Sequence, residues 1–448
     1  MNKSTLAVAV AVGLLAQQAG AAGFIEDSKA TLKLRNFYIN TDNRDSGTKA
    51  AGAQNKLEEW GQGFQLDYTS GFTQGTVGFG IDAIGLLGVR LDSGGGTNGR
   101  SGNSYGGTVF PSKSNGDAVN EFSSLGLTAK AKISQTELRY GTLMPKLPVI
   151  SYNDGRLLPQ TFEGGQITSN EFKDLTLIGG QIEHVKGRNS SNNEQMSIGG
   201  ASARTANSNK FIYAGGDYKV TKDLLLQYYY GNLDKFYKQN FLGLVHNWSI
   251  GPGVLKTDLR YFNSRDDGKN AYDPAYFSNG DYSSSVNGKG KVSNNLYSGL
   301  FLYTVEGHTF GGGYQVSNGS SDFPWLNQGD GSSAYITTDM QISKFARAGE
   351  RTWQARYSYD FAKLGVPGLT AGAVYLRGDN IDTYGAKGKT SNGASEWERD
   401  ITVAYVVQEG PLKNLGLMWK NAMWRNDIAN QRDQDENRLI VSYSIPLL

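Results

Sequence analysis

The last hundred residues alternate apolar and polar side chains with a period of two. Between residues 351 and 361, one face carries Trp353, Ala355, Tyr357, Tyr359 and Phe361, and the other carries Gln354, Arg356, Ser358 and Asp360. The segment 437–445 repeats the pattern, with Leu439, Val441, Tyr443 and Ile445 alternating with Arg438, Ile440, Ser442 and Ser444. Successive side chains of a strand point to opposite faces. Because the apolar faces are aromatic and the polar faces carry Arg or Lys, we predict membrane-spanning strands around a wet, cationic lumen.

Short turns alternate with long polar loops along the whole chain. The turns are expected at 69–71, 134–135, 172–174, 219–222, 251–253, 306–307, 363–368 and 410–414. The loops are expected at 41–58, 85–119, 145–165, 187–209, 232–240, 264–292, 318–350, 378–395 and 426–436, where Gly, Ser, Asn and Asp are frequent. Eight turns and nine loops join eighteen strands. We therefore predict an all-β fold, a single transmembrane antiparallel β-barrel of about eighteen strands with long extracellular loops, with sixteen strands as the alternative.

The N-terminus has the pattern of a secretory signal peptide. A short positive start, Met1–Lys3, precedes the apolar run Leu6–Leu15 and the small residues Ala19–Ala21. This run is too short to span a bilayer as a helix, and no later run of 18 apolar residues follows. We predict that residues 1–21 are a signal peptide and that residues 22–448 form one outer-membrane porin domain.

Composition agrees with an exported barrel. The chain has no Cys, 59 Gly and 25 Tyr, and its formal net charge is +2. Near-neutral charge does not favour nucleic-acid binding, and the mean hydropathy of −0.45 is expected when every second strand residue faces water. A soluble all-β repeat protein is the alternative, but the sequence lacks an internal repeat.

The same parity predicts which charged side chains face the lumen. Basic residues on the polar faces of several strands are Lys33, Arg35, Lys130, Lys132, Arg139, Arg356, Lys420 and Arg438. Because the first and last strands must pair to close a barrel, Arg35, Arg356, Lys420 and Arg438 are expected on one side of the wall. A track of positive charge attracts anions, although each charge alone could be an ordinary solvated group. Arg377 and Arg399 lie on the apolar parity, so we expect them at the loop rim or displaced by a bulge.

The loop at 145–165 differs from the other loops because it is apolar and contains three prolines, Pro145, Pro148 and Pro159. An apolar loop requires burial, and a wide barrel offers its lumen. We predict that this third loop folds inward and presents Asp154 and Arg156 at a constriction. Packing over the barrel rim is the alternative.

The sequence gives little support to other chemistry. Its three histidines, His184, His246 and His308, lack metal-ligand spacing, and no G-x-S-x-G element is present. We predict no metal, no cofactor, no catalytic residue and no enzyme activity. The competing functions are a general diffusion porin with weak anion selectivity and an outer-membrane barrel hydrolase, which would need a nucleophile–base pair.

Several segments resemble the OprD-type (Occ) outer-membrane channels. They are Gly23–Ser28, Leu34–Tyr38, Ser70–Gly80, Arg156–Phe162, Gly349–Tyr357, Val366–Thr370, Tyr405–Pro411 and Asn437–Val441. Asn153–Arg156 and Trp397–Asp400 are most similar to the OccK branch, which is associated with aromatic carboxylates such as vanillate and benzoate.

The resemblance implies a substrate-selective porin of Gram-negative bacteria that takes up small carboxylates past a basic ladder and an inward third loop. It also places Arg44, Asp154 and Arg156 at the narrow zone. The candidate pore-lining residues are therefore Arg35, Arg44, Lys130, Lys132, Arg139, Asp154, Arg156, Arg356, Arg399, Lys420 and Arg438. The expected partners are small carboxylate solutes, outer-membrane lipid and lipopolysaccharide, with the protein a monomer or a weak homotrimer.

Overall fold

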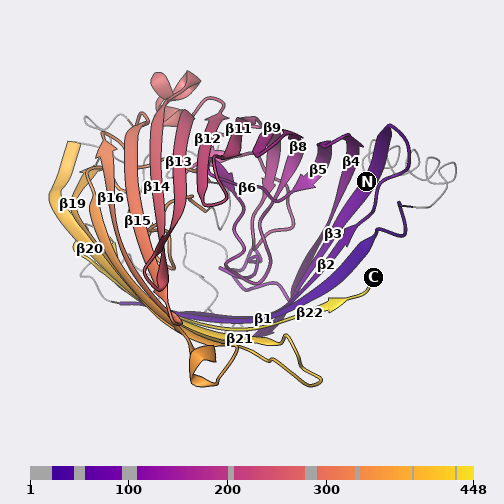
Figure 1. The fold of residues 1–448 in the computed structure, drawn as a ribbon. Coiled ribbons are helices and arrows are strands. Elements are labelled where there is room, and N and C mark those ends of the chain that lie inside the picture. The colour runs from indigo at the N-terminus through magenta and orange to yellow at the C-terminus, as the bar shows by residue number, and fades with distance from the viewer. Residues whose placement is uncertain are drawn as a thin grey trace.

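The structure, a computed structural model, describes residues 23–44, 56–92, 108–199, 206–277, 290–327, 333–385, 388–428 and 431–448. Within these residues, eighteen strands form one antiparallel sheet that closes on itself where β1 (Lys29–Asn43) pairs with β22 (Gln434–Pro446). Figure 1 shows the resulting barrel, with indigo β1 beside yellow β22. The all-β barrel and its strand number are thus confirmed. The predicted signal peptide lies outside the described residues.

The remaining elements follow in chain order. They are β2 (Lys56–Thr69), β3 (Val77–Asp92), β4 (Glu121–Ile133), β5 (Thr136–Leu143), β6 (Lys146–Leu147), β7 (Ile150–Ser151), β8 (Thr161–Phe172), β9 (Leu175–Lys186), β10 (Ser197–Ile198), β11 (Phe211–Lys219), β12 (Leu224–Leu233), β13 (Tyr237–Ile250), β14 (Gly253–Asp266), η1 (Gly268–Ala271), η2 (Pro274–Tyr276), β15 (Ser293–Val305), β16 (His308–Gly319), β17 (Leu326–Asn327), β18 (Arg351–Asp360), η3 (Phe361–Leu364), β19 (Leu369–Gly385), β20 (Gly388–Val406) and β21 (Gly416–Asn426). No helix among the described residues is long and apolar enough to cross a membrane.

The short turns all fall between the strands where the sequence predicts them, at one end of the barrel. One long loop differs from its prediction. Most of 378–395 is strand, because β19 and β20 continue as a hairpin whose register shifts after Gly378. A polar, glycine-containing segment can pair as a strand, and alternation of apolar residues does not reveal such a strand.

The strands are inverted relative to those of a soluble barrel. Large apolar side chains on the outer face are exposed, such as Leu125 at 73% and Tyr140 at 59% of their surface. On β18 and β22 their neighbours along the strands face inward and are mainly polar or charged. This arrangement suits lipid outside and water inside, and it confirms the period-two prediction on β18 and β22.

Several loops, rather than one, fold into the barrel. The 144–160 loop, between β5 and β8, enters the lumen as predicted, and Figure 1 shows its β6 segment inside the barrel. The described parts of the 320–350 loop, between β16 and β18, and of the 93–120 loop also pack against the inner wall. These two loops are rich in Gly and Ser, so their composition predicts exposed loops.

The largest hydrophobic core lies inside the barrel, against the inner faces of β9 and β11–β15. Phe241 and Phe262 of the wall pack on each other with ring centroids 4.7 Å apart, and Phe323 of the 320–350 loop lies 5.0 Å from Phe262. Gly231 on β12 provides space for the 144–160 loop, since a Cβ there would lie 2.9 Å from Cβ of Val149. An aromatic wall therefore anchors the inward loops on one side of the lumen.

Candidate functional site: the lumen and its inward loops

The tip of the 144–160 loop is bound to the wall by Arg35 of β1. Both Nη atoms of Arg35 donate to the carboxylate of Asp154, at 2.6 and 3.0 Å, and Nη1 also donates to the carbonyl of Arg156 at 2.7 Å. Asp154, which the sequence predicts at a constriction together with Arg156, therefore pairs with the wall. This ion pair fixes the loop inside the barrel.

Two further arginines hold the same tip. Nη1 of Arg188, just after β9, donates to Oδ1 of Asn153 at 3.0 Å. Nη1 of Arg438 on β22 donates to the carbonyl of Gly155 at 3.3 Å. With Arg35, these groups approach the loop from different strands, so a closed barrel is needed to bring them together.

Arg438 also holds the 320–350 loop. Its Nη2 donates to the carbonyl of Gln341 at 3.1 Å, and its Nε donates to Glu436 at 2.6 Å. Glu436 in turn accepts from Nε2 of Gln341 at 3.0 Å. Arg438 is only 7% exposed, so this contact lies away from bulk water. One buried guanidinium thus joins both inward loops to the seam of the barrel.

Arg356 and Arg260 bind the 320–350 loop from the neighbouring wall. Arg356 donates to the carbonyl of Thr337 and, at 2.8 Å, to its own strand neighbour Gln354. Arg260 donates to the carbonyl of Tyr335 at 3.3 Å and lies 4.1 Å from the centroid of that ring. Burial raises the pKa of Tyr335. The sequence predicts Arg356 as an inward residue but gives no particular signal for Arg260.

Buried carboxylates complete the attachment of the loops. Glu398 on β20 is fully buried and accepts three backbone N–H bonds, from Gln341, Ile342 and Ser343, at 2.7–3.2 Å. Glu59 on β2 does the same for residues 108–110. These acids were not predicted as functional, because a lone Glu on a strand is ordinarily a solvated group.

Three of the predicted basic residues lie near the turn end of the barrel. Lys130 is buried and pairs with Asp82 at 2.7 Å, so it stabilises the structure around the first turn. Arg139 pairs with Glu137 on its own strand and remains 43% exposed. Lys132 is exposed close to the turn. These residues share inward parity, but they stand apart from the loop contacts.

Two of the predicted pore-lining residues lie outside the lumen. Arg44 follows the end of β1, is exposed at the rim and pairs with Asp435. Arg399 lies on the outer parity of β20 and donates to Asn421 on β21, while its neighbours Glu398 and Asp400 point inward. The lumenal assignment of both is therefore wrong. Arg44 was placed by resemblance alone, and Arg399 follows the strand alternation without a bulge.

Lys420 and Arg156 remain inside the barrel. Lys420 pairs in register with Arg438 on the inner face of β21 and β22. Arg156 extends from the loop tip toward Glu59 and Glu436, which are close enough to interact with it electrostatically. Its Nε and Nη1 atoms are buried without a hydrogen-bond partner among the described residues. Arg35, Arg356 and Arg438 each use their guanidinium groups on protein atoms, so Arg156 differs from them.

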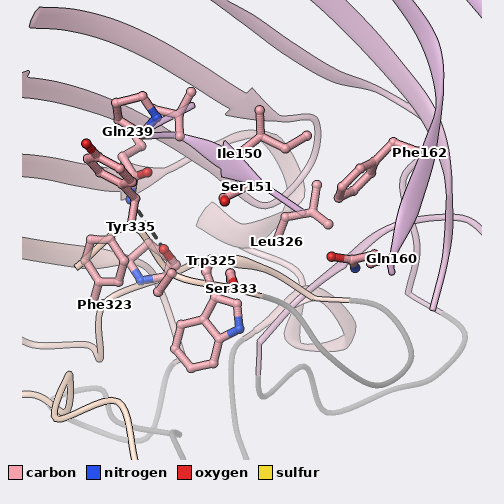
Figure 2. A pocket seen from close by; sticks show the side chains of 14 residues that line it. Ile150, Ser151, Gln160, Phe162, Gln239, Phe323, Trp325, Leu326, Ser333 and Tyr335 are labelled. Carbon is pink, nitrogen blue, oxygen red and sulfur yellow. Dashed lines mark hydrogen bonds between the residues drawn. The ribbon is translucent and has the colours of Figure 1, made fainter. Parts of the chain in front are cut away.

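The 144–160 and 320–350 loops also contact each other directly. Ser151 and Ser333 form a backbone bridge between them, and Figure 2 shows these serines beside Ile150 and Leu326. A cavity of about 20 Å³ lies at this contact, with Gln160 at its edge. That is room for about one water molecule. The loops therefore form one joined partition across part of the lumen.

Two larger cavities border the 144–160 loop within the lumen. One of about 270 Å³ lies between the loop and β1, β2 and β22, and its lining combines Lys33 and Arg35 with Tyr152, Leu158 and other apolar residues. The other, about 460 Å³, lies nearer the turn end and is lined by Arg139, Lys146, Asp67 and Asp82, among others. Within the described ranges, no group of three His, Asp or Glu residues is arranged to hold a metal ion.

The sequence and the fold match proteins of one family. The model of the outer membrane porin, OprD family, matches residues 22–447. The porin-like protein GalP of Pseudomonas putida is 37% identical over 99% of this chain and 97% of its own length.

Solved structures agree with this match. OccK8 (OprE) of Pseudomonas aeruginosa is 61% identical, with a TM-score of 0.84 over 95% of this chain and 100% of that one. OpdK of the same organism, crystallised with vanillate, is 36% identical, with a TM-score of 0.81 and the same coverage. The chain therefore belongs to the OprD family of outer membrane porins.

Proposed function

We propose that this porin selects small carboxylates, aromatic acids among them, for passive uptake across the outer membrane. The observation that carries the proposal is the 270 Å³ cavity beside the 144–160 loop, where cationic and apolar surfaces meet. Lys33 and Arg35, which are paired with Asp67 and Asp154, are the cations on the wall, and Tyr152 and Leu158 supply apolar surface on the loop. A solute that carries a carboxylate on an aromatic ring matches both surfaces. The OpdK structure with vanillate supports this class of solute.

Arg156, which is adjacent in sequence to the cavity-lining Leu157 but does not itself line the cavity, is the proposed contact for the carboxylate of a solute at the loop tip. The other arginines at the loop tip are engaged by the protein, whereas Nε and Nη1 of Arg156 are covered by protein and have no partner among the described residues, so the side chain would turn toward the passage to bind the solute. A guanidinium forms strong charge-assisted hydrogen bonds with a carboxylate. The nearby Glu436 and Glu59 keep the local charge balanced, which favours release after binding.

The test compares solutes of one shape and different charge. Benzoate and its neutral analogue benzamide are measured in liposome flux assays, together with ion selectivity from reversal potentials. The parent channel should pass benzoate several-fold faster than benzamide. Arg156→Gln should reduce benzoate flux about tenfold, because a hydrogen bond to a charged group contributes roughly 1.5 kcal/mol or more.

Lys132→Gln is the matched control, since Lys132 is an inward cation away from the loop. It should change benzoate flux little. Equal passage of benzoate and benzamide through the parent channel would instead identify a general diffusion porin. If Arg156→Gln still passed benzoate faster than benzamide by the parental ratio, Arg156 would be excluded as the carboxylate contact. The selectivity would then come from the residues that line the cavity.

A further inference from the structure

Arginine and tryptophan alternate along one row on the outer wall of the barrel. Trp353 on β18 pairs with Arg377 on β19, which pairs with Trp397 on β20, which pairs with Arg425 on β21. Trp353 is 42% exposed, and the side chain of Arg377 is 44% exposed. The row lies toward the long-loop ends of these strands, where an outer-membrane barrel has its extracellular aromatic girdle.

The next row toward the membrane adds another arginine and another aromatic ring. Tyr375 pairs in register with Arg399. The Tyr375 ring centroid lies 5.3 Å from that of Trp353 and 5.9 Å from that of Trp397. The guanidinium of Arg425 lies 5.9 Å from the Trp397 ring. The aromatic rings therefore form a continuous surface bordered by guanidinium groups.

Arg399 lacks an anionic partner within this surface. Its Nη2 donates to the neutral amide of Asn421, and its Nε is buried with no hydrogen-bond partner in the part of the chain that the structure describes. An arginine on the lipid face is destabilising at the bilayer midplane and is tolerated near the interface. An anion supplied by the membrane would balance the charge of the Arg399 guanidinium.

The carboxylates near the other two arginines leave room for such an anion. Arg377 pairs with Asp379 at 3.2 Å, and both side chains are nearly half exposed. Exposed pairs of this kind contribute little stability, so a phosphate can replace the carboxylate. Arg425 pairs with Asp435 at 2.6 Å and is less exposed, so it supplies mainly its charge and its contact with Trp397.

An apolar hollow continues from this surface toward the turn end of the same strands. It has a volume of about 650 Å³ and is lined by Tyr357, Tyr359, Ala371, Ala373 and Ile401, among others. Ala373 pairs in register with Tyr357 and with Ile401, the residue two positions after Arg399. Small side chains between larger ones leave a trough on the lipid side of the wall. A trough of this kind fits an acyl chain.

We propose that the outer wall of β18–β21 binds one phosphorylated glycolipid of the outer leaflet, the lipid A part of lipopolysaccharide. Arg377 and Arg399 hold a phosphate, with Arg425 adding positive charge. Trp353, Tyr375 and Trp397 contact the faces of the sugars, and an acyl chain lies in the trough over Ala371 and Ala373. The site is separate from the lumen and does not depend on which solute the channel passes.

Native mass spectrometry of the delipidated porin in detergent tests the proposal. The probes are bis-phosphorylated lipid A, the same lipid without phosphates, and inorganic phosphate alone. The parent protein should retain one bis-phosphorylated lipid A. Retention should fall at least tenfold for the dephosphorylated lipid and for the variant R377Q/R399Q/R425Q.

Two variants serve as comparisons. Arg265→Gln is the control, because Arg265 is an arginine near the long-loop end of β14 whose Nη1 is bonded to the carbonyls of Ser264 and Asn294 at 2.8 and 3.3 Å. It should retain lipid A like the parent. Ala373→Trp fills the trough and leaves all three arginines in place, so it should weaken lipid A retention even if the triple variant fails to fold. Unchanged single-channel conductance in phosphatidylcholine bilayers checks that the barrel is intact.

Three results would overturn the proposal. One is equal retention of lipid A by the parent, the triple variant and Ala373→Trp. Another is competition by millimolar inorganic phosphate, which would indicate a site for free phosphate. The third is a lipid-free oligomer that the triple variant dissociates, which would assign the surface to a second copy of the chain.

Discussion

The two walls that hold the inward loops use different physical means. The wall of β11–β15 presents fully buried rings, such as Phe241 and Phe262, and holds the loops by apolar packing. The wall of β20–β22 presents Glu398, Glu436 and Arg438, and holds the same loops by directional hydrogen bonds, from Glu398 and Arg438 to loop backbone and from Glu436 to the side-chain amide of Gln341. Each loop therefore extends from an apolar anchor to a charged one.

The difference shows how a lumen with many charged side chains can have few of them free to bind a solute. Most inward arginines and buried acids of the charged wall are engaged with loop atoms, so they determine where the passage lies. Apolar packing is non-directional and sets how deeply a loop enters, whereas hydrogen bonds set the register of its tip. Changes on the two walls should therefore have different signatures.

The largest effect is expected from Arg438→Gln. This change removes contacts to both inward loops and leaves Glu436 buried without its cation, which costs roughly 3–5 kcal/mol. Single-channel recordings should show higher mean conductance and more frequent transitions between levels. Lys420→Gln, which removes an equal charge one strand away, should leave the transitions as in the parent. If Arg438→Gln kept the mean conductance and the transition frequency of the parent, the proposed role of the β20–β22 wall would be contradicted.

Phe323→Ala should produce the next largest effect, on the apolar wall. Its ring packs against Phe262, and truncating a buried Phe costs about 3 kcal/mol or more. The loop should loosen at its base, seen as faster proteolysis within 320–350 and a lower melting temperature in detergent. Because no charge changes, the ion selectivity at low salt should stay near that of the parent. Phe310→Ala, a change on the outer face, gives the matched comparison. Equal protease sensitivity of both variants would argue against an apolar anchor.

The alternation of side chains predicts much of this architecture but few of the contacts between the inward loops and the wall. On β18 and β22 only one face is apolar, so the sequence correctly orients Arg356 and Arg438. On β11–β14 both faces carry apolar or aromatic residues, because the inner face packs against loops, and alternation cannot identify the wall that holds them. Arg438 binds a carbonyl 283 residues away in sequence, a contact that exists only after the barrel closes. Contacts to backbone atoms also leave no sequence signal at the acceptor.

A smaller effect is expected from Asp154→Asn, which acts at the charged anchor of a single loop. Arg35 would lose its anionic partner and present more positive charge to the lumen, so reversal potentials should shift toward anion preference. The pair is partly exposed, so its loss costs only about 1 kcal/mol or less. The shift should shrink at 1 M salt, where the Debye length is roughly 3 Å. Asp67→Asn, which frees Lys33 on the wall, provides the control. A larger shift from Asp67→Asn would mean that the loop tip does not dominate selectivity.

The smallest effect is expected from Glu350, at the end of the 320–350 loop. Burial raises the pKa of this carboxyl well above its usual range, and the nearby Glu396 adds to the rise. A raised pKa means that the folded loop favours the protonated acid, so stability from this group is full below about pH 4.5 and declines as pH rises through the folded pKa. Glu350→Gln mimics the protonated form and removes that decline. The melting temperature of the parent should therefore fall relative to Glu350→Gln as pH rises from 4 to 8, with the two proteins similar at the acid end. Parallel curves of melting temperature against pH for the two proteins would show that Glu350 does not titrate in the folded loop. The wall of β20–β22 would then hold this loop independently of pH.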